Sequence, residues 1–279
     1  MRFLCPGLVF FLLFSCIQPK KGNAHGAADS MANSMGKNMA DSMADNMGDI
    51  ADRLSVVMRN AELPPAMSAQ IQAAANRDTA FFDALYVCLA EDCSLRQLVD
   101  KQHPLPPDYI PVALAALNGG PYQLGRPLTL RTDAADSLYE MALAARSQGV
   151  TLVVSSAYRS YDYQEQVYSR IVREMGQEAA DRESARPGHS QHQTGLVADF
   201  GSIDDSFARS DAGLWMAANA ARFGWSLSYP DGYETVTGYR WESWHYRYVG
   251  INLAAFIENY FNGIQHYALR FLYEWSVYQ

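Results

Sequence analysis

The chain is predicted to fold as an α+β domain in which helices and strands are interspersed. Three observations support this prediction: an amphipathic pattern over residues 132–148, an apolar run at 150–154 that is typical of a buried strand, and a second strand pattern at 225–229. Of the 279 residues, 49% are hydrophobic and 19% are charged, which is enough for one sizeable globular domain. The formal net charge is −8 and the sequence has no basic blocks, so we expect no nucleic-acid partner.

The N-terminus reads as an export signal. One basic residue and an apolar core precede Leu13-Phe-Ser-Cys16, which is typical of a bacterial lipoprotein signal. We therefore expect residues 1–15 to be a signal peptide and Cys16 to carry lipid, although an ordinary signal peptide cut nearby is the alternative. The mature protein would be exported and anchored to a membrane, facing the periplasm or the cell wall.

Residues 16–55 are predicted to be a low-complexity tether. The methionines that recur every four residues are Met31, Met35, Met39, Met43 and Met47. A helix has about 3.6 residues per turn, so this repeat drifts by roughly 40° each time and forms no fixed apolar face. We interpret the segment as a flexible or partly helical tether. A thioether cluster for a soft metal such as Cu(I) is the alternative.

Residues 56–105 are predicted to form a helical N-terminal region at the periphery. Cys88 and Cys93 would be the two thiols left in the exported chain, which makes them a candidate disulfide. The alternative is two reduced, buried cysteines, because a regular helix does not hold side chains at this spacing in bridging geometry.

Residues 106–279 are predicted to form the catalytic domain. Thr132 can cap a helix with an apolar face, and Gly149 can end it. The strand predicted at 150–154 follows directly. The aromatic-rich stretch at 253–275 is predicted to be helical and to pack on the core.

A second helix of this domain is predicted to begin after Ser160, to carry Gln164 and to stop near Gly176. Arg159 therefore lies where a strand ends and a helix begins, which is a common place for functional side chains. Taken alone, however, this arginine is better explained by a structural ion pair with a nearby carboxylate.

Two later segments of the domain offer groups that can bind a metal. His192 and Asp199 come from the first segment and His245 from the second, and together they make a set that leaves a coordination position open for water. A catalytic zinc needs this open position. Glu242 is three residues from His245 and could take a proton from that water without being a ligand. Taken alone, His192 would more often be a structural histidine.

The segment around His245 has the alternation of a half-buried strand. Over residues 244–248, aromatic side chains alternate with His245 and Arg247. On a regular strand Glu242 and His245 would point in opposite directions. The chain must therefore bend before Trp244 if both residues serve one metal.

Four blocks of sequence carry a family resemblance. They are Leu98–Pro107, Ser155–Gln164, the motif Ser190-x-His192-x-x-Gly195-x-x-x-Asp199, and Glu242-x-Trp244-His245. In this order they resemble the VanY-type D-alanyl-D-alanine carboxypeptidases, which are zinc peptidases that share a fold with the hedgehog signalling domain. The resemblance covers roughly residues 95–275. One departure is visible, because this chain has Gly195-Leu-Val-Ala-Asp199 where the family usually has Gly-Leu-Ala-Val-Asp.

The resemblance implies a central, mainly antiparallel sheet flanked by helices. It also implies one Zn²⁺ per chain, whose ligands would be His192, Asp199 and His245. Glu242 would be the catalytic base, and Arg159 would point at the scissile carbonyl and hold its developing charge. His189 would lie outside the ligand set, because the ligand of the family is the histidine followed by x-x-Gly.

The same resemblance implies the substrate. Ser190 and Gln164 would contact it, although a helix cap for Ser190 and a solvated helix face for Gln164 are alternatives. The implied reaction removes the terminal D-alanine from a peptidoglycan stem peptide, and we expect a monomer. The alternatives are an L,D-carboxypeptidase that trims tetrapeptide stems and a non-catalytic cell-wall-binding lipoprotein. The latter would be expected to have lost Glu242 or a ligand.

Overall fold

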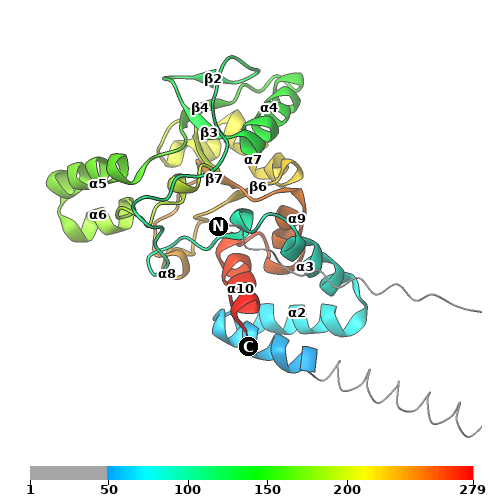
Figure 1. Cartoon of the computed structure of the whole chain (residues 1–279). Helices are drawn as coiled ribbons and strands as arrows, with labels where there is room; N and C mark the ends of the chain where they lie inside the picture. Colours follow the sequence, from blue (N-terminus) through cyan, green and yellow to red (C-terminus); the bar gives the residue numbers. More distant parts are fainter. Residues whose placement is uncertain (1–48, 279) are drawn as a thin grey trace, which may run out of the picture. The chain divides into compact units, whose positions relative to one another are not determined.

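The structure is a computed structural model that describes residues 49–278 (Figure 1). The predicted signal peptide, the lipidated Cys16 and the methionine repeat lie outside these residues. Within the described part, none of the helices combines the length and the apolar character needed to cross a membrane.

A five-stranded sheet in the described part of the chain holds the segments that carry the candidate site. Its strands, in spatial order, are β2 (Gln123–Leu124), β4 (Val153–Ser156), β5 (Val197–Phe200), β7 (His245–Tyr248) and β6 (Trp225–Leu227). β2 and β4 are parallel, whereas the β4–β5, β5–β7 and β6–β7 pairs are antiparallel. The predicted, mainly antiparallel sheet is therefore confirmed. A separate antiparallel pair joins β1 (Leu114–Ala116) to β3 (Thr129–Arg131).

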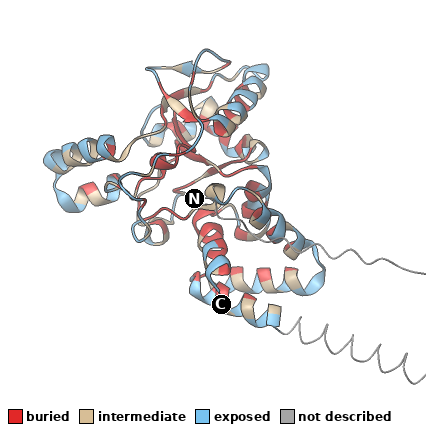
Figure 2. Ribbon diagram, viewed as in Figure 1, coloured by how far each residue is buried: buried red, intermediate tan, exposed pale blue. Residues whose placement is uncertain are grey.

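Helices lie around this sheet (Figure 1). The α-helices are α4 (Thr132–Ser147), α5 (Tyr161–Met175), α6 (Gln177–Glu183), α7 (Asp211–Asn219) and α8 (Glu234–Thr237). Short 3₁₀ turns are η2 (Gln191–Thr194), η3 (Asp205–Arg209) and η4 (Ala220–Phe223). Figure 2 shows the sheet strands and the inner faces of α4 and α7 as buried. The buried residues there are mostly hydrophobic. The apolar face of α4 is fully buried and belongs to the same core as Val154, Phe200 and Trp225.

The local signals explain most element ends. Ser160 caps α5 by accepting a hydrogen bond from the Tyr163 backbone N–H, as predicted. The predicted cap at Thr132 is wrong, because Thr132 is the first helical residue and its hydroxyl donates to the Ala113 carbonyl at 2.8 Å. The predicted strand at 150–154 starts later, at Val153, because the chain before it still closes the C-terminal turn of α4.

The predicted C-terminal helix is interrupted. It forms two helices, α9 (Ile251–Phe261) and α10 (Gln265–Val277), because Asn262 adopts a left-handed conformation with φ +54° and Gly263 follows with φ +75°. Both helices bury most of their aromatic side chains.

The N-terminal region is helical and packs against the C-terminal helices. Its helices are a first helix over residues 49–60, α2 (Pro65–Arg77) and α3 (Ala80–Ala90), and the 3₁₀ turn η1 (Cys93–Arg96) follows. They share a second apolar core with α9 and α10, in which the rings of Phe81 and Phe256 are 5.7 Å apart. An apolar helix face buries its surface against whichever complementary face the tertiary fold brings near it. The boundary between residues 56–105 and 106–279 stays a prediction.

The candidate disulfide is absent from the described structure. Cys88 is a buried member of the second core, whereas Cys93 is an exposed residue at the start of η1. Both thiols are free, because the helix that carries Cys88 ends between them and Cys88 faces inward.

Two buried arginines join the segment after α3 to the strands, one in β3 and one in β7. Arg131 donates to Asp92 Oδ2 at 3.0 Å, and Arg247 donates to the carbonyl oxygens of Leu95 and Gln97 at 3.1 and 2.9 Å. Arg247 is fully buried, so the prediction that β7 is half-buried is wrong. One face of β7 is covered by the aromatic core, and on the other face this N-terminal segment covers Arg247.

Candidate active site and metal centre

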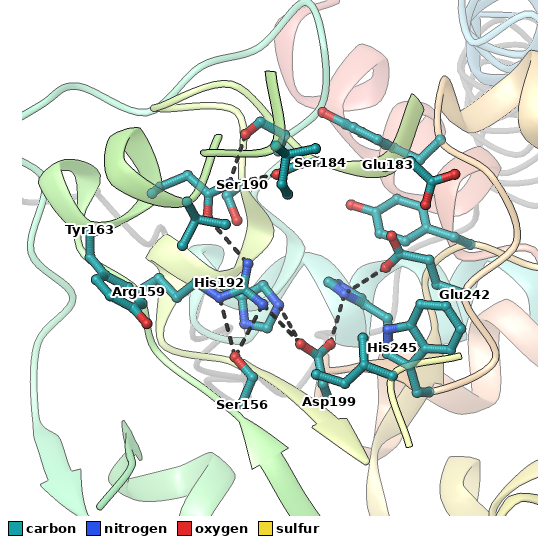
Figure 3. A pocket seen from close by; sticks show the side chains of 18 of the residues that line it. Ser156, Arg159, Tyr163, Glu183, Ser184, Ser190, His192, Asp199, Glu242 and His245 are labelled. Atoms are coloured by element: carbon teal, nitrogen blue, oxygen red, sulfur yellow. Dashed lines mark hydrogen bonds and ion pairs between the residues drawn. The ribbon is translucent and has the colours of Figure 1, made fainter. Parts of the chain in front are cut away.

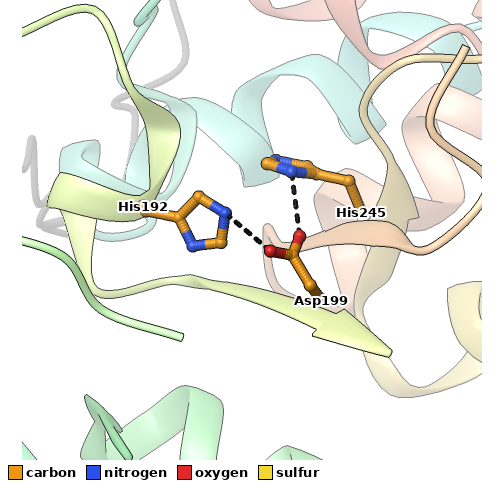
Figure 4. A group of neighbouring side chains, drawn as sticks. All are labelled: His192, Asp199 and His245. Atoms are coloured by element: carbon orange, nitrogen blue, oxygen red, sulfur yellow. Dashed lines mark ion pairs between the residues drawn. The ribbon is translucent and has the colours of Figure 1, made fainter. Parts of the chain in front are cut away.

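The three predicted metal ligands converge because of the sheet register. Asp199 in β5 and His245 in β7 are directly paired across the antiparallel strands. His192 lies in η2, and Gly195, with φ +72°, reverses the chain between that turn and β5. One ligand atom from each of the three side chains lies within 4.8 Å of the other two (Figure 4). Among the described residues, this is the one group of its kind.

The donor set fits a zinc ion. His192 Nδ1 is 2.7 Å from the Ala157 carbonyl, which leaves Nε2 free to face the centre, 3.2 Å from Asp199 Oδ2. Asp199 Oδ1 is buried without a hydrogen bond, although His245 Nδ1 is 3.2 Å away. Atoms that approach each other without hydrogen-bond alignment are compatible with a cation held between them. Two imidazoles and a carboxylate are a ligand set that zinc accepts.

The electrostatics of the three side chains are strongly coupled. Burial alone would raise the pKa of Asp199, but the neighbouring His192 and His245 outweigh it electrostatically and hold that pKa well below its usual range. Burial, with a contribution from Arg159, lowers the pKa of His192 to about 4. Burial opposes the protonation of His245, but Asp199 and Glu242 overcome it and raise its pKa to about 9. The centre is therefore already arranged to hold one compensating positive charge.

Glu242 lies beside the ligand set and outside it. The chain turns between Glu242 and His245, since the His245 N–H donates to the Glu242 carbonyl at 3.1 Å, so the predicted bend before Trp244 is confirmed. Glu242 Oε2 is 3.2 Å from His245 Nδ1, and the side chain is 13% exposed towards the cavity. Burial raises the pKa of Glu242, and the neighbouring His245 opposes that shift.

Arg159 forms the structural ion pair considered from the sequence and also lines the cavity. Its guanidinium donates to Asp199 Oδ2 at 2.9 Å, which is the ion pair expected of a structural arginine. Ser156 Oγ and Gln164 Oε1 also accept hydrogen bonds from it, at 3.1 and 3.3 Å. The side chain nevertheless lines the cavity and is 18% exposed (Figure 3). It is therefore held rigidly while one surface remains available to a substrate.

Gln164 and Ser190 also line the cavity, and the structure narrows their roles. Gln164 is buried, so the solvated-face alternative is wrong, and its amide donates to Ser184 Oγ and to the Ala185 carbonyl at 3.3 and 2.7 Å. With its oxygen already bound to Arg159, Gln164 has little hydrogen-bonding capacity left for a substrate. Ser190 precedes η2, but its hydroxyl does not cap that turn. Substrate contact by Ser190 stays a prediction.

The cavity has a volume of about 400 Å³ and includes residues that sequence reasoning missed. The missed lining residues include Arg126, Tyr163, Arg170, Glu183, Tyr229, Tyr239 and Arg240. Tyr229 lies against the metal centre, with its ring centroid 4.7 Å from that of His245. In the sequence, the one indication that Tyr229 could line the site was its place at the end of a predicted strand. His189 stays outside the ligand set, as predicted, and its Nδ1 is 2.8 Å from the Asp100 carbonyl.

Comparison with known proteins agrees with this geometry. The model of the VanY family, described as D-alanyl-D-alanine carboxypeptidase, matches residues 127–251. A putative carboxypeptidase of Bacillus subtilis, YodJ, is 35% identical over 170 residues, which are 58% of this chain and 62% of the relative. The chain thus spans less than two thirds of the length of this curated relative.

Two solved structures are similar in both fold and sequence. The LdcB LD-carboxypeptidase has a TM-score of 0.54 and 34% identity, with 60% of this chain and 85% of LdcB covered. The vancomycin-resistance D,D-pentapeptidase VanY from a VanB-type cassette, solved as a mutant with Zn(II), has a TM-score of 0.51 and 30% identity. The similarity covers 61% of this chain and 96% of that VanY chain. With the ligand set and the sheet described above, the chain belongs to the VanY family of D-alanyl-D-alanine carboxypeptidases.

Proposed function

We propose that the protein is a zinc-dependent D,D-carboxypeptidase that removes the terminal D-alanine from peptidoglycan stem peptides. The observation that carries this proposal is the convergence of His192, Asp199 and His245 with Glu242 beside them in one cavity. Family membership and the Zn(II) complex of the related VanY support it.

The mechanism follows from the position of each side chain. A bound zinc would supply an acidified water and polarise the scissile carbonyl. Glu242 accepts a proton from the attacking water as the oxygen bonds to the carbonyl carbon. It then gives the proton to the departing amine as the C–N bond breaks. The raised pKa of Glu242 suits a group that must both take up and release a proton.

Arg159 stabilises the negative charge that develops on the carbonyl oxygen. Its hydrogen bonds to Ser156 and Gln164 hold the guanidinium in position, so that little reorganisation is needed during the reaction. Because Arg159 also bonds to Asp199, it orients a ligand carboxylate and faces the substrate at the same time.

A second candidate is L,D-carboxypeptidase activity on tetrapeptide stems, and the similarity to LdcB favours considering it. Incubating the purified, zinc-loaded protein with pentapeptide and tetrapeptide stems, followed by mass analysis, separates the two. We expect loss of one alanine from the pentapeptide. Trimming of the tetrapeptide alone would replace the proposal with the L,D-activity, and cleavage of neither would point to a binding protein.

We further propose that the protein is an exported, monomeric lipoprotein, anchored through Cys16 and facing the periplasm or the cell wall. The support is the sequence Leu13-Phe-Ser-Cys16 after an apolar run. Cys16→Ala should abolish lipid labelling and release the protein from membranes. Unchanged labelling of this variant would favour an ordinary signal peptide.

A further inference from the structure

One end of the cavity carries more positive charge than the proposed mechanism uses. The arginines that line the cavity are Arg126, Arg159, Arg170 and Arg240. Two of them are matched by carboxylates in the structure. Arg159 donates to Asp199 at 2.9 Å, and Arg240 lies 3.4 Å from Glu183 and 2.6 Å from Asp205. Arg126 and Arg170 have no comparably close carboxylate partner among the described residues.

Arg126 has a neutral partner. Its Nη1 donates to the Tyr163 hydroxyl at 3.1 Å, and no carboxylate of the described residues lies within 4.0 Å of its guanidinium. Arg170 is 3.9 Å from Glu174, but both side chains are more than half exposed, so this pair is weak. The α5 end of the cavity therefore has positive charge available for an anionic ligand.

Tyr163 adds a second donor at the same place. Because its oxygen accepts from Arg126, its own proton can be donated to another group. The pKa of Tyr163 is lowered, first by the hydrogen bond from Arg126 and then by the charges of Arg126, Arg159 and Arg170. Three guanidinium groups thus act on this hydroxyl, which strengthens it as a hydrogen-bond donor.

The position of Tyr163 relative to the catalytic groups indicates which side of the cavity a bound peptide would reach. In Figure 3, Tyr163 lies beside Arg159, at the opposite side of the cavity from Glu242. A peptide whose scissile carbonyl lies between Glu242 and Arg159 would therefore extend past Arg159 towards Tyr163. Gln164, the nearest alternative donor on α5, already uses its amide within the protein.

We propose that Arg126 and Tyr163 bind a carboxylate of the substrate at the α5 end of the cavity. This inference rests on the proposed peptidase function. A guanidinium fork with an adjacent hydroxyl matches carboxylate geometry, and hydrogen bonds to charged groups are the strong ones. The carboxylate has two sources: the C-terminus of the departing residue, or an acidic side chain on the residue that precedes the two D-alanines.

The experiment compares Arg126→Met with the wild-type protein on two peptides. The first is diacetyl-L-lysyl-D-alanyl-D-alanine, whose one carboxylate is C-terminal, and the second has glutamate in place of the lysine. We expect kcat/KM to fall by up to about fivefold, mainly through KM, because an exposed charged contact away from the scissile bond contributes binding rather than chemistry. A loss on both peptides assigns the C-terminal carboxylate, and a loss on the glutamyl peptide alone assigns the side chain.

Matched variants make the result specific. Arg173→Met removes the same charge from an exposed position of α5 that does not line the cavity, and it should leave both peptides unaffected. Tyr163→Phe should reproduce part of the Arg126→Met effect, and its intact fold can be checked by thermal melting. Equal kcat/KM for Arg126→Met and wild type on both peptides overturns the inference, as does an equal loss in Arg173→Met. If the wild type cleaves neither peptide, the proposed function fails instead.

Discussion

Replacing Glu242 with glutamine tests the base of the proposed mechanism with little change in shape. The side chain is 13% exposed and lies 3.2 Å from His245 Nδ1, so an amide of the same size can fill the same space. Glutamine cannot accept the proton of the attacking water. Because His192, Asp199 and His245 are unchanged, zinc content and folding should be retained.

The expected loss can be stated as a rate and as a barrier. General base catalysis by a positioned side chain contributes about 10²–10⁴-fold. This range corresponds to ~2.7–5.4 kcal/mol of transition-state stabilisation. Glu242 also protonates the departing amine, so we expect a loss in kcat of at least this size with a much smaller change in substrate binding.

The assay measures release of D-alanine from a pentapeptide stem, with zinc determined by elemental analysis on the same sample. His192→Ala is the matched control and should lose zinc and activity together, because two ligands hold zinc poorly. Near-normal turnover of Glu242→Gln with zinc retained would refute the mechanism. Loss of zinc from Glu242→Gln would instead make Glu242 part of the metal shell.

Three other predictions follow from buried groups. Gln164→Met should lower the free energy of unfolding by about 1–3 kcal/mol in urea titrations, because buried hydrogen-bond partners including Arg159 are left unsatisfied; an unchanged midpoint would contradict this. Burial lowers the pKa of His266 to about 4, whereas the same side chain in the unfolded chain titrates near its model value of 6.5. As the pH falls from about 6.5 to 4, the unfolded state therefore takes up a proton that the folded state does not, and the protein loses stability in that window. In urea titrations, the free energy of unfolding of the wild type should be roughly 2 kcal/mol lower at pH 5 than at pH 7. The His266→Gln variant should lack this loss. Thiol titration should find Cys93 reactive in the native protein, and Cys88, whose pKa burial raises to about 12, reactive only after unfolding.

The sequence was sufficient for features that depend on a few neighbouring residues. The helix that begins after Ser160 and the bend before Trp244 are both present in the structure. Backbone conformation and capping depend on local chemistry, which a short window of sequence contains. The ligand set was predicted from the family resemblance that four blocks of sequence carry together, because His192 taken alone would more often be a structural histidine.

Contacts between distant segments needed the tertiary structure. The proximity of Arg126 to Tyr163, the use of the Gln164 amide to hold Arg159, and the docking of the segment after α3 through Arg247 have no local signal. Predictions failed where a partner from elsewhere in the chain competed with the local one, as the Ala113 carbonyl does at Thr132.

The same reason explains the two cores. An apolar pattern predicts which face of a helix will be buried, but it does not predict which other segment will cover that face. Residues 52–90 pack with α9 and α10, which lie at the other end of the chain. The sequence by itself predicted most of the elements, and its family resemblance predicted the ligand set and Glu242 as the base. The partners of each face, and the charge at the α5 end of the cavity, were decided by long-range packing, because burial depends on the surface that the whole fold brings into contact.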